Sequence, residues 1–204
     1  MAATLLRGSI LHFPDGTPAA PAVDRRHAAF LEDGVLAVAD GRIAGLLPAA
    51  DARAAGWAVD GAVDHRGRLI LPGFVDAHVH FPQVEMIGAW GEQLVGWLER
   101  HTFPTEARHA EFAFSEALAG FFLDQLLAHG TTTAACFATV HAHSADALFA
   151  AAEHRHMRLV AGKVLMDRNA PAALRDSAEQ GHAETEALSR RWHGRDRRGY
   201  AGTP

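Results

Sequence analysis

Two histidines in the first half of the 204-residue chain, His78 and His80, are spaced to bind one metal ion. They end an apolar run over 74–80 that predicts a β-strand, and side chains two residues apart in a strand point to the same face. Neutral imidazole suits zinc, with Zn–N distances of about 2.0–2.1 Å. The spacing indicates a zinc site, although an isolated His-x-His pair more often consists of hydrogen-bonded or exposed histidines.

The rest of the predicted strand favours the metal interpretation. One face would carry Phe74, Asp76 and both histidines, and the other Val75, Ala77 and Val79. An apolar face beneath helices, with a polar face opposite, is typical of a strand inside a (β/α) barrel, where catalytic groups gather at the carboxyl ends of the strands. Pro72-Gly73 directly precedes the run. Asp76 either orients a ligand histidine or is a buried structural carboxylate.

Short strands are predicted before this point. They cover 5–13, 30–46 and 63–71, with a Pro/Ala-rich stretch up to Val23 and a short alanine-rich helix after Ala49. Asp33-Gly34 and Asp40-Gly41 interrupt the second run, and Asp-Gly between apolar runs favours tight hairpins. Residues 1–71 are therefore predicted to form a small β-sandwich layer.

Strand and helix patterns alternate over 72–204, which is typical of βα units with a parallel sheet. The predicted order is strand 74–80, a loop to Pro104, a helix to His129 ended by Gly130, strand 131–140, a helix capped by Ser144 up to His156, strand 158–166, a helix from Pro171 to Trp192, and a strand beginning at Gly199. We therefore expect an α/β fold, the N-terminal part of a TIM-type (β/α)8 barrel with about three βα units. A full barrel takes about 250 residues, so the predicted barrel is incomplete.

Composition excludes several classes of function. The formal net charge of −5 argues against general affinity for nucleic acid or anionic membranes. The single cysteine, Cys136, cannot form an intramolecular disulfide, and no apolar run is long enough for a signal peptide or a membrane span, so we expect a cytoplasmic protein. The five arginines between Arg190 and Arg198 suggest either a nucleic-acid patch or a solvated helix end, and the helix dipole favours the second.

Several motifs in order resemble one family of enzymes. Pro72-Gly73, the apolar strand with Asp76, and His78-Val79-His80 together resemble the amidohydrolase superfamily. Further stretches are similar to guanine deaminases: Phe81-Pro82-Gln83, Trp97 to Glu106, Gly130 to Thr133, Phe137 to His141, and Gly162 to Asp167. The resemblance covers essentially the whole chain and is strongest from Leu71 to Asn169.

The resemblance implies hydrolytic deamination of guanine to xanthine and ammonia. It implies one Zn²⁺ per active site, which lowers the pKa of bound water to about 7 and so supplies a nucleophile. By match of motif, His78 and His80 would be zinc ligands, and Gln83 would hydrogen-bond the purine, with Phe81 and Pro82 lining the pocket beside it. An exposed loop position is the structural alternative for Gln83. A homodimer is expected for the complete enzyme.

For several other residues the sequence gives weaker evidence of a role in the active site. Trp90, Trp97 and Phe103 either wall the planar base or pack in the core. Some amidohydrolases carbamylate a strand lysine, but the one-zinc family implied here makes Lys163 an ion-pair or structural residue. His141 and His143 form a second His-x-His pair, which we expect to be exposed to solvent.

The resemblance also predicts that part of the machinery lies outside this sequence. The arginine-phenylalanine substrate pair, the remaining metal ligands and the acid/base glutamate would follow residue 204, so we expect this chain alone to be inactive. Two histidines are too few for a catalytic zinc, which usually has three protein ligands. The alternatives are another purine or pyrimidine amidohydrolase, or a non-catalytic association module that uses the open edge of the sheet.

Overall fold

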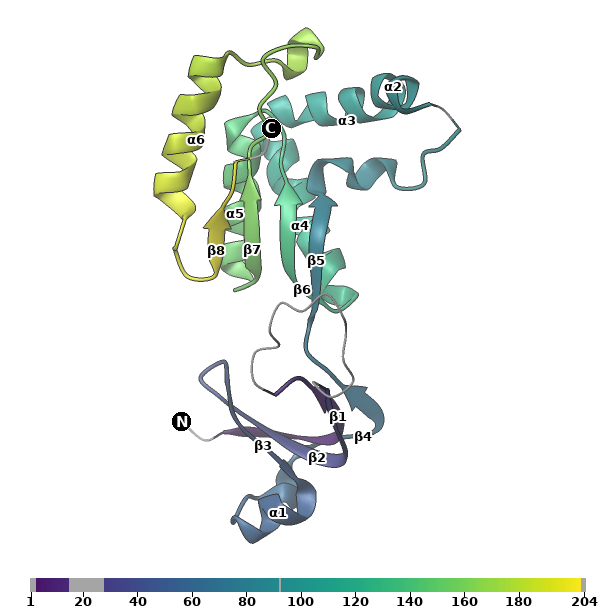
Figure 1. Ribbon diagram of the computed structural model, residues 1–204, viewed down its shortest axis with the longest axis vertical. Helices are drawn as coiled ribbons and strands as arrows, with labels where there is room; N and C mark the ends of the chain where they lie inside the picture. The colour runs from purple at the N-terminus through teal and green to yellow at the C-terminus, as the bar shows by residue number, and fades with distance from the viewer. Residues whose placement is uncertain (1–2, 15–27, 92, 203–204) are drawn as a thin grey trace. The chain divides into compact units, whose positions relative to one another are not determined.

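The computed structural model describes residues 3–14, 28–91 and 93–202. The chain divides into two compact units, Met1–Pro72 and Gly73–Pro204, which are described separately below (Figure 1). The Pro/Ala-rich stretch predicted up to Val23 lies largely outside the described residues. Within the described part of the chain, no helix is both long enough and apolar enough to cross a membrane.

The first unit contains one four-stranded sheet with the strand order β3-β2-β1-β4. The elements are β1 (Thr4–His12), β2 (Ala29–Ala39), β3 (Arg42–Pro48), helix α1 (Ala49–Ala54), the 3-10 turn η2 (Val59–Gly61) and β4 (Val63–Ile70). β2 is antiparallel to both β1 and β3, whereas β4 is parallel to β1. The predicted short helix after Ala49 is thus confirmed.

One of the two predicted Asp-Gly hairpins forms and the other does not. Asp40 and Gly41 adopt φ values of 50° and 71°, so this turn joins β2 to β3 with left-handed backbone at both central positions. Asp33 and Gly34, in contrast, lie inside the continuous strand β2, where Glu32 and Asp33 form a bulge opposite Ser9 of β1. Gly34 is small because a Cβ there would lie 2.8 Å from Cδ1 of Ile10. Close packing, and not a turn, explains this glycine.

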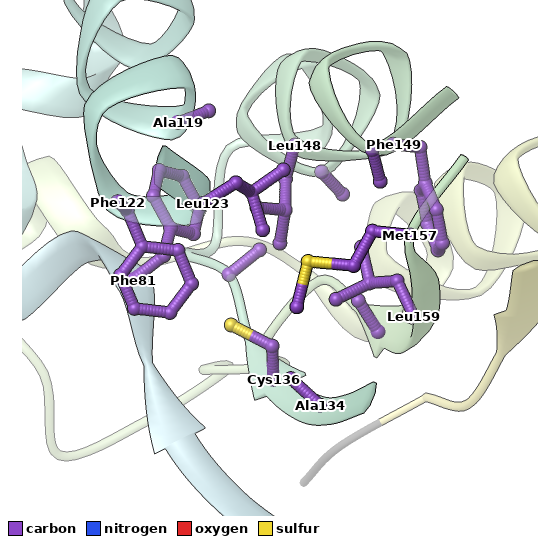
Figure 2. Close-up of a cluster of buried hydrophobic side chains, with 14 of the residues drawn as sticks. Phe81, Ala119, Phe122, Leu123, Ala134, Cys136, Leu148, Phe149, Met157 and Leu159 are labelled. Atoms are coloured by element: carbon purple, nitrogen blue, oxygen red, sulfur yellow. The ribbon is translucent and has the colours of Figure 1, made fainter. Parts of the chain in front are cut away.

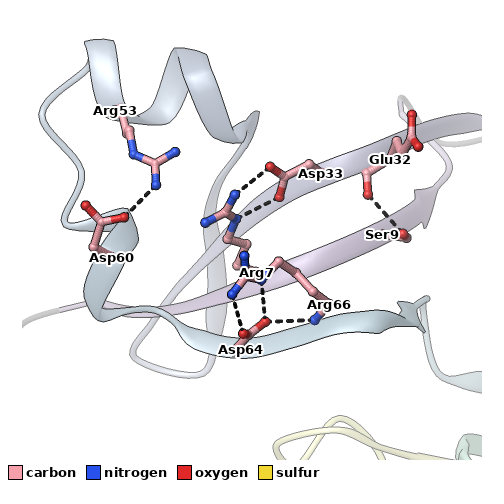
Figure 3. A network of polar contacts seen from close by, with 8 residues as sticks. All are labelled: Arg7, Ser9, Glu32, Asp33, Arg53, Asp60, Asp64 and Arg66. Carbon is pink, nitrogen blue, oxygen red and sulfur yellow. Dashed lines mark hydrogen bonds and ion pairs between the residues drawn. The ribbon is translucent and has the colours of Figure 1, made fainter.

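Ion pairs link elements of this unit (Figure 3). The guanidinium of Arg7 on β1 donates two hydrogen bonds of 2.7 Å to the carboxylate of Asp33 on β2. This contact lowers the pKa of Asp33. Arg53 on α1 pairs with Asp60 at 2.5 Å. The Arg53 and Asp60 side chains are 44% and 87% exposed, so solvent screens this pair more than the Arg7–Asp33 pair, whose side chains are 17% and 46% exposed.

The second unit begins with a parallel sheet in the order β5-β6-β7-β8. Its strands are β5 (Phe74–His80), β6 (Thr131–Phe137), β7 (Arg158–Gly162) and β8 (Arg198–Tyr200). The main helices are α4 (Phe112–Ala128), α5 (Ala142–His154) and α6 (Ala178–Trp192). The strand predicted to begin at Gly199 is therefore present. Gly73 directly precedes β5. A Cβ at this position would lie 2.0 Å from Oγ1 of Thr132, so the close packing leaves no room for a side chain.

The core of this unit lies between the sheet and its helices (Figure 2). Alternate residues of the strands face it, including Ala134 and Cys136 on β6 and Leu159 on β7. The helices contribute Ala119, Phe122, Leu123, Leu148, Phe149, Leu188 and Trp192. Burial raises the pKa of the Cys136 thiol to about 12, so this cysteine is an unreactive core residue. The residues between these core positions point to the other face of the sheet.

Three sequence predictions about this unit were wrong in detail. The expected loop after β5 is largely helical, with η3 (Phe81–Met86), α2 (Leu94–Trp97), the π turn η4 (Leu98–Thr102), α3 (Phe103–Ala107) and η5 (Arg108–Ala110). Ser144 lies in the first turn of α5 and is not its N-cap residue. Its hydroxyl accepts a hydrogen bond from the backbone N–H of Thr139 and donates one to the carbonyl of His141. Pro171 precedes only the 3-10 turn η6 (Ala172–Leu174), and Ser177 caps α6 by accepting from the amide of Gln180.

Candidate functional site

The two histidines of β5 converge at its carboxyl end. Nε2 of His78 and Nε2 of His80 lie 3.3 Å apart, and the ring centroids are separated by 5.1 Å. Both side chains are on the strand face opposite Val79, which packs against the helical core. The predicted pairing of the two imidazoles on one face is therefore present. The two nitrogens lie within hydrogen-bond distance of each other.

Phe137 at the end of β6 supports both rings. Its ring stacks on His80 with a centroid distance of 4.5 Å and an interplanar angle of 7°, and it contacts His78 edge to face at 5.1 Å. The parallel register places Phe137 directly beside His80. Sequence analysis did not assign Phe137 to the site. Phe137 follows the core residue Cys136 in the strand, so the sequence could indicate that its side chain points to the face opposite the core. The register that places it beside His80 is known only from the folded sheet.

The surroundings of His80 favour the form that binds metal. Burial, followed by the nearby charge of His78, lowers the pKa of His80. A lowered pKa keeps His80 neutral at physiological pH, and only neutral imidazole has a lone pair for a metal. Asp76 accepts a 3.0 Å hydrogen bond from the backbone N–H of His78 and so holds the strand end in place.

Gln83 follows β5 in the turn η3 and touches the same cluster. Its Nε2 lies 2.8 Å from Oε1 of Glu106 on α3 and 3.3 Å from Nδ1 of His80. Gln83 is partly buried, so it is not the exposed loop residue of the structural alternative. Glu106 was part of the matched stretch but had no assigned role, because sequence alone does not reveal that its carboxylate is buried.

The neighbours of Gln83 have a different environment. Phe81 and Pro82 are fully buried, and the ring of Phe81 packs against His109 and Phe122. They hold the segment against the core. Of the loop aromatics, Trp90 is 86% exposed, whereas Trp97 donates from Nε1 to the carbonyl of Ala89.

A cavity of about 710 Å³ borders the histidines. Its walls include His78, His80, Gln83, Trp97, Phe122 and Leu126. Val79, on the opposite face of β5, also lines it. We therefore locate the candidate chemistry at the convergence of His78, His80 and Gln83, and not in the apolar part of the cavity along α4.

Lys163 and the second histidine pair have structural contacts. Nζ of Lys163 is completely buried and lies 2.5 Å from Oδ2 of Asp176 and 2.7 Å from Oε2 of Glu184, which confirms the ion-pair interpretation. The expectation that His141 and His143 are exposed was wrong. Both are partly buried, their rings stack at 5.6 Å, and Nε2 of His143 bonds the carbonyl of His109 at 2.7 Å.

Four of the five arginines between Arg190 and Arg198 form ion pairs within the protein. Arg190 pairs with Glu186, Arg191 with Asp146, and both Arg195 and Arg198 with Glu153. Their charge is largely balanced by neighbouring carboxylates. This pattern favours the solvated helix end over a nucleic-acid patch.

His109 gives the unit a pH dependence that can be measured. Burial lowers the pKa of this fully buried histidine to about 4. The unfolded chain binds this proton below about pH 6.5, so the folded state loses stability as the pH falls from about 6.5 toward about 4. We expect the loss from His109 to be on the order of 3 kcal/mol. Urea unfolding across this pH range would measure it.

The matched control for this prediction is His154, which is exposed at the end of α5. His109→Gln should flatten the acid limb of the stability curve, whereas His154→Gln should leave its slope unchanged. Equal slopes in the His109→Gln variant and the unmodified protein would contradict the prediction.

The geometry brings two imidazole nitrogens together, and within residues 3–14, 28–91 and 93–202 no group of three or more His, Cys, Asp or Glu side chains is arranged to hold a metal ion. Comparison with known proteins gives a family match over residues 69–201 to the amidohydrolase family. The chain belongs to this family. Amidohydrolases are in general metal-dependent, which agrees with the paired histidines.

Known relatives of this amidohydrolase include guanine deaminases. Over 141 residues it is 55% identical to the guanine deaminase of Escherichia coli, covering 69% of this chain and 32% of that protein. It is 44% identical over 206 residues to a probable guanine deaminase of Deinococcus radiodurans, covering 98% of this chain and 46% of that protein. The amidohydrolase chain thus spans less than half the length of these two relatives.

Solved structures give the same result for the fold. The structure of E. coli guanine deaminase matches with a TM-score of 0.91 and 44% identity, covering 98% of this chain and 46% of that chain. A guanine deaminase from C. acetobutylicum with bound guanine matches with a TM-score of 0.82 and 26% identity, covering 99% and 46%. The mixed α/β fold with two sheets is that of these amidohydrolases.

Proposed function

We propose that the whole protein is a guanine deaminase that hydrolyses guanine to xanthine and ammonia. The observation that carries the proposal is the convergence of His78 and His80 beside Gln83 at the carboxyl end of β5. The relatives and the solved structures support it, since they are named for this activity and one of them holds guanine.

The histidine pair fits a zinc ion. Two nitrogens each about 2.0–2.1 Å from one tetrahedral zinc would be separated by about 3.3–3.4 Å. The 3.3 Å between the two Nε2 atoms matches this separation. When bound, zinc supplies a water nucleophile at neutral pH by lowering its pKa to about 7. His78 and His80 would hold the ion, and the stacked ring of Phe137 would fix the plane of His80.

Gln83 would orient the substrate. Its amide sits next to the ligand histidine, so a purine that it binds lies within reach of the metal site. Phe81 and Pro82 would act indirectly, because their burial fixes the backbone from which Gln83 projects.

The proposal extends to the architecture. The sheet β5-β6-β7-β8 with its helices would be the first part of a (β/α)8 barrel, and residues 1–71 would belong to a small β-sandwich layer. Residues 1–204 would then supply two of the metal ligands and one substrate contact. A catalytic zinc usually needs a third protein ligand.

The activity assay follows xanthine and ammonia with zinc present. In the whole protein we expect turnover of guanine and not of adenine, cytosine or dihydropyrimidines. Rapid turnover of one of those compounds without guanine turnover would assign a different amidohydrolase reaction.

Residues 1–204 expressed alone are expected to give no measurable xanthine, because proton transfer and metal binding each lack a required group. The comparison is the same chain mixed with a separately expressed C-terminal half of the E. coli relative. Activity that appears only in the mixture would support the proposal that the active site is divided between residues 1–204 and the C-terminal half. Turnover by residues 1–204 alone that is lost in His78→Ala would refute it.

A further inference from the structure

Glu106 on α3 is a buried carboxyl group with one clear partner. The residue is 6% exposed, and its Oε1 accepts a hydrogen bond from Nε2 of Gln83 at 2.8 Å. Burying a carboxyl group is costly unless its oxygens are hydrogen-bonded. The hydrogen bond from Gln83 therefore offsets part of the cost of burying the Glu106 carboxyl group.

This contact fixes which way the amide of Gln83 faces. An ionised carboxylate only accepts hydrogen bonds, so with Glu106 ionised the amide presents its N–H₂ group to Oε1 of Glu106. The opposite orientation would place the carbonyl oxygen of Gln83 against the carboxylate oxygen. Oε1 of Gln83 is consequently turned away, and among the described residues it has no hydrogen-bond donor.

The second contact of Nε2, with Nδ1 of His80, is weaker. Its length is 3.3 Å. If His80 binds metal through Nε2, its Nδ1 carries the ring proton and cannot accept from Gln83. Two donors then face each other and this contact opposes the orientation, so the bond to Glu106 alone holds the amide.

We propose that Glu106 is a positioning residue that makes Gln83 present its carbonyl oxygen to the substrate, and thereby selects purines that carry a proton on N1. This inference rests on the proposed function. Guanine has an N1–H donor. A purine with an unprotonated N1, such as 2,6-diaminopurine, would place a lone pair against the same oxygen. Without Glu106 the amide can rotate and accommodate either base.

The first experiment compares guanine with 2,6-diaminopurine, since both carry a 2-amino leaving group. The variants in the whole protein are Glu106→Gln and Glu106→Ala, with Glu99→Gln as the matched control, because Glu99 is exposed on η4. In both Glu106 variants we expect the ratio of kcat/KM, guanine over 2,6-diaminopurine, to fall about tenfold or more. The change should lie mainly in KM. Glu99→Gln should leave the ratio unchanged.

A ratio is independent of the fraction of folded enzyme, so a merely structural role for Glu106 would reduce both activities together and leave it constant. A constant ratio in both Glu106 variants would overturn the proposal.

A second measurement does not depend on turnover. In protein labelled with ¹⁵N-glutamine, the side-chain N–H₂ signal of Gln83, identified by its loss in Gln83→Ala, should exchange slowly with solvent and should become fast-exchanging in Glu106→Ala. An unchanged exchange rate would show that Glu106 does not hold the amide. Failure of the unmodified protein to deaminate guanine would overturn the proposed function and the selection for N1–H with it, while the amide signal would still decide the contact.

Discussion

His80→Ala in the whole protein is expected to reduce kcat/KM for guanine by at least about a hundredfold and to lower the bound zinc below one ion per chain. Loss of a residue that only orients a metal ligand typically costs 10–100-fold in affinity or activity, so loss of a ligand itself should cost at least as much. The convergence of the two Nε2 atoms at 3.3 Å predicts a similar loss for His78→Ala. Metal analysis after gel filtration and steady-state kinetics are the measurements.

The control for this prediction is His154→Ala, a substitution of an exposed histidine on the same unit. It should retain zinc and activity. Far-UV circular dichroism would verify that His80→Ala is folded, since the ring of His80 also stacks on Phe137. A folded His80→Ala variant with full zinc content and full activity would show that the histidine pair is not the metal site.

Lys163→Met is expected to destabilise the protein by about 3–5 kcal/mol. Removing one partner of a buried ion pair leaves uncompensated buried charge. Here the ammonium group faces two carboxylates, of which the Asp176 side chain is 4% exposed and the Glu184 side chain 29%. Asp176 also accepts a hydrogen bond from the backbone N–H of Met166, so the same contact anchors the segment between β7 and α6. Equilibrium urea unfolding measures the loss.

A matched exposed pair gives the contrast. Arg190→Met removes an i,i+4 pair with Glu186 on the surface of α6, which should cost only about 0.3–0.5 kcal/mol. Replacing the buried carboxylates together with the lysine, as Lys163→Met/Asp176→Asn/Glu184→Gln, should recover part of the loss. A cost for Lys163→Met no larger than that for Arg190→Met would contradict the buried-pair explanation.

Most strands and helices could be predicted from sequence because their signals are local. The apolar run over 74–80 predicts β5, and the apolar pattern ended by Gly130 predicts α4, where Gly130 adopts φ 86°. The errors arose where a residue had two physical explanations. Gly34 is small for packing and not for a turn, and Ser144 bonds Thr139 inside α5 and does not cap it.

The sequence by itself determined the family, the pairing of His78 with His80 on one strand face, and the placement of Gln83 just after them. These features depend on spacing along one strand, where side chains alternate with a fixed period. Only the tertiary structure decided the partners: Phe137 beside His80, Glu106 beside Gln83, and Asp176 with Glu184 around Lys163. Each of these contacts joins segments that only strand register or helix packing brings together, and no local pattern specifies such a meeting.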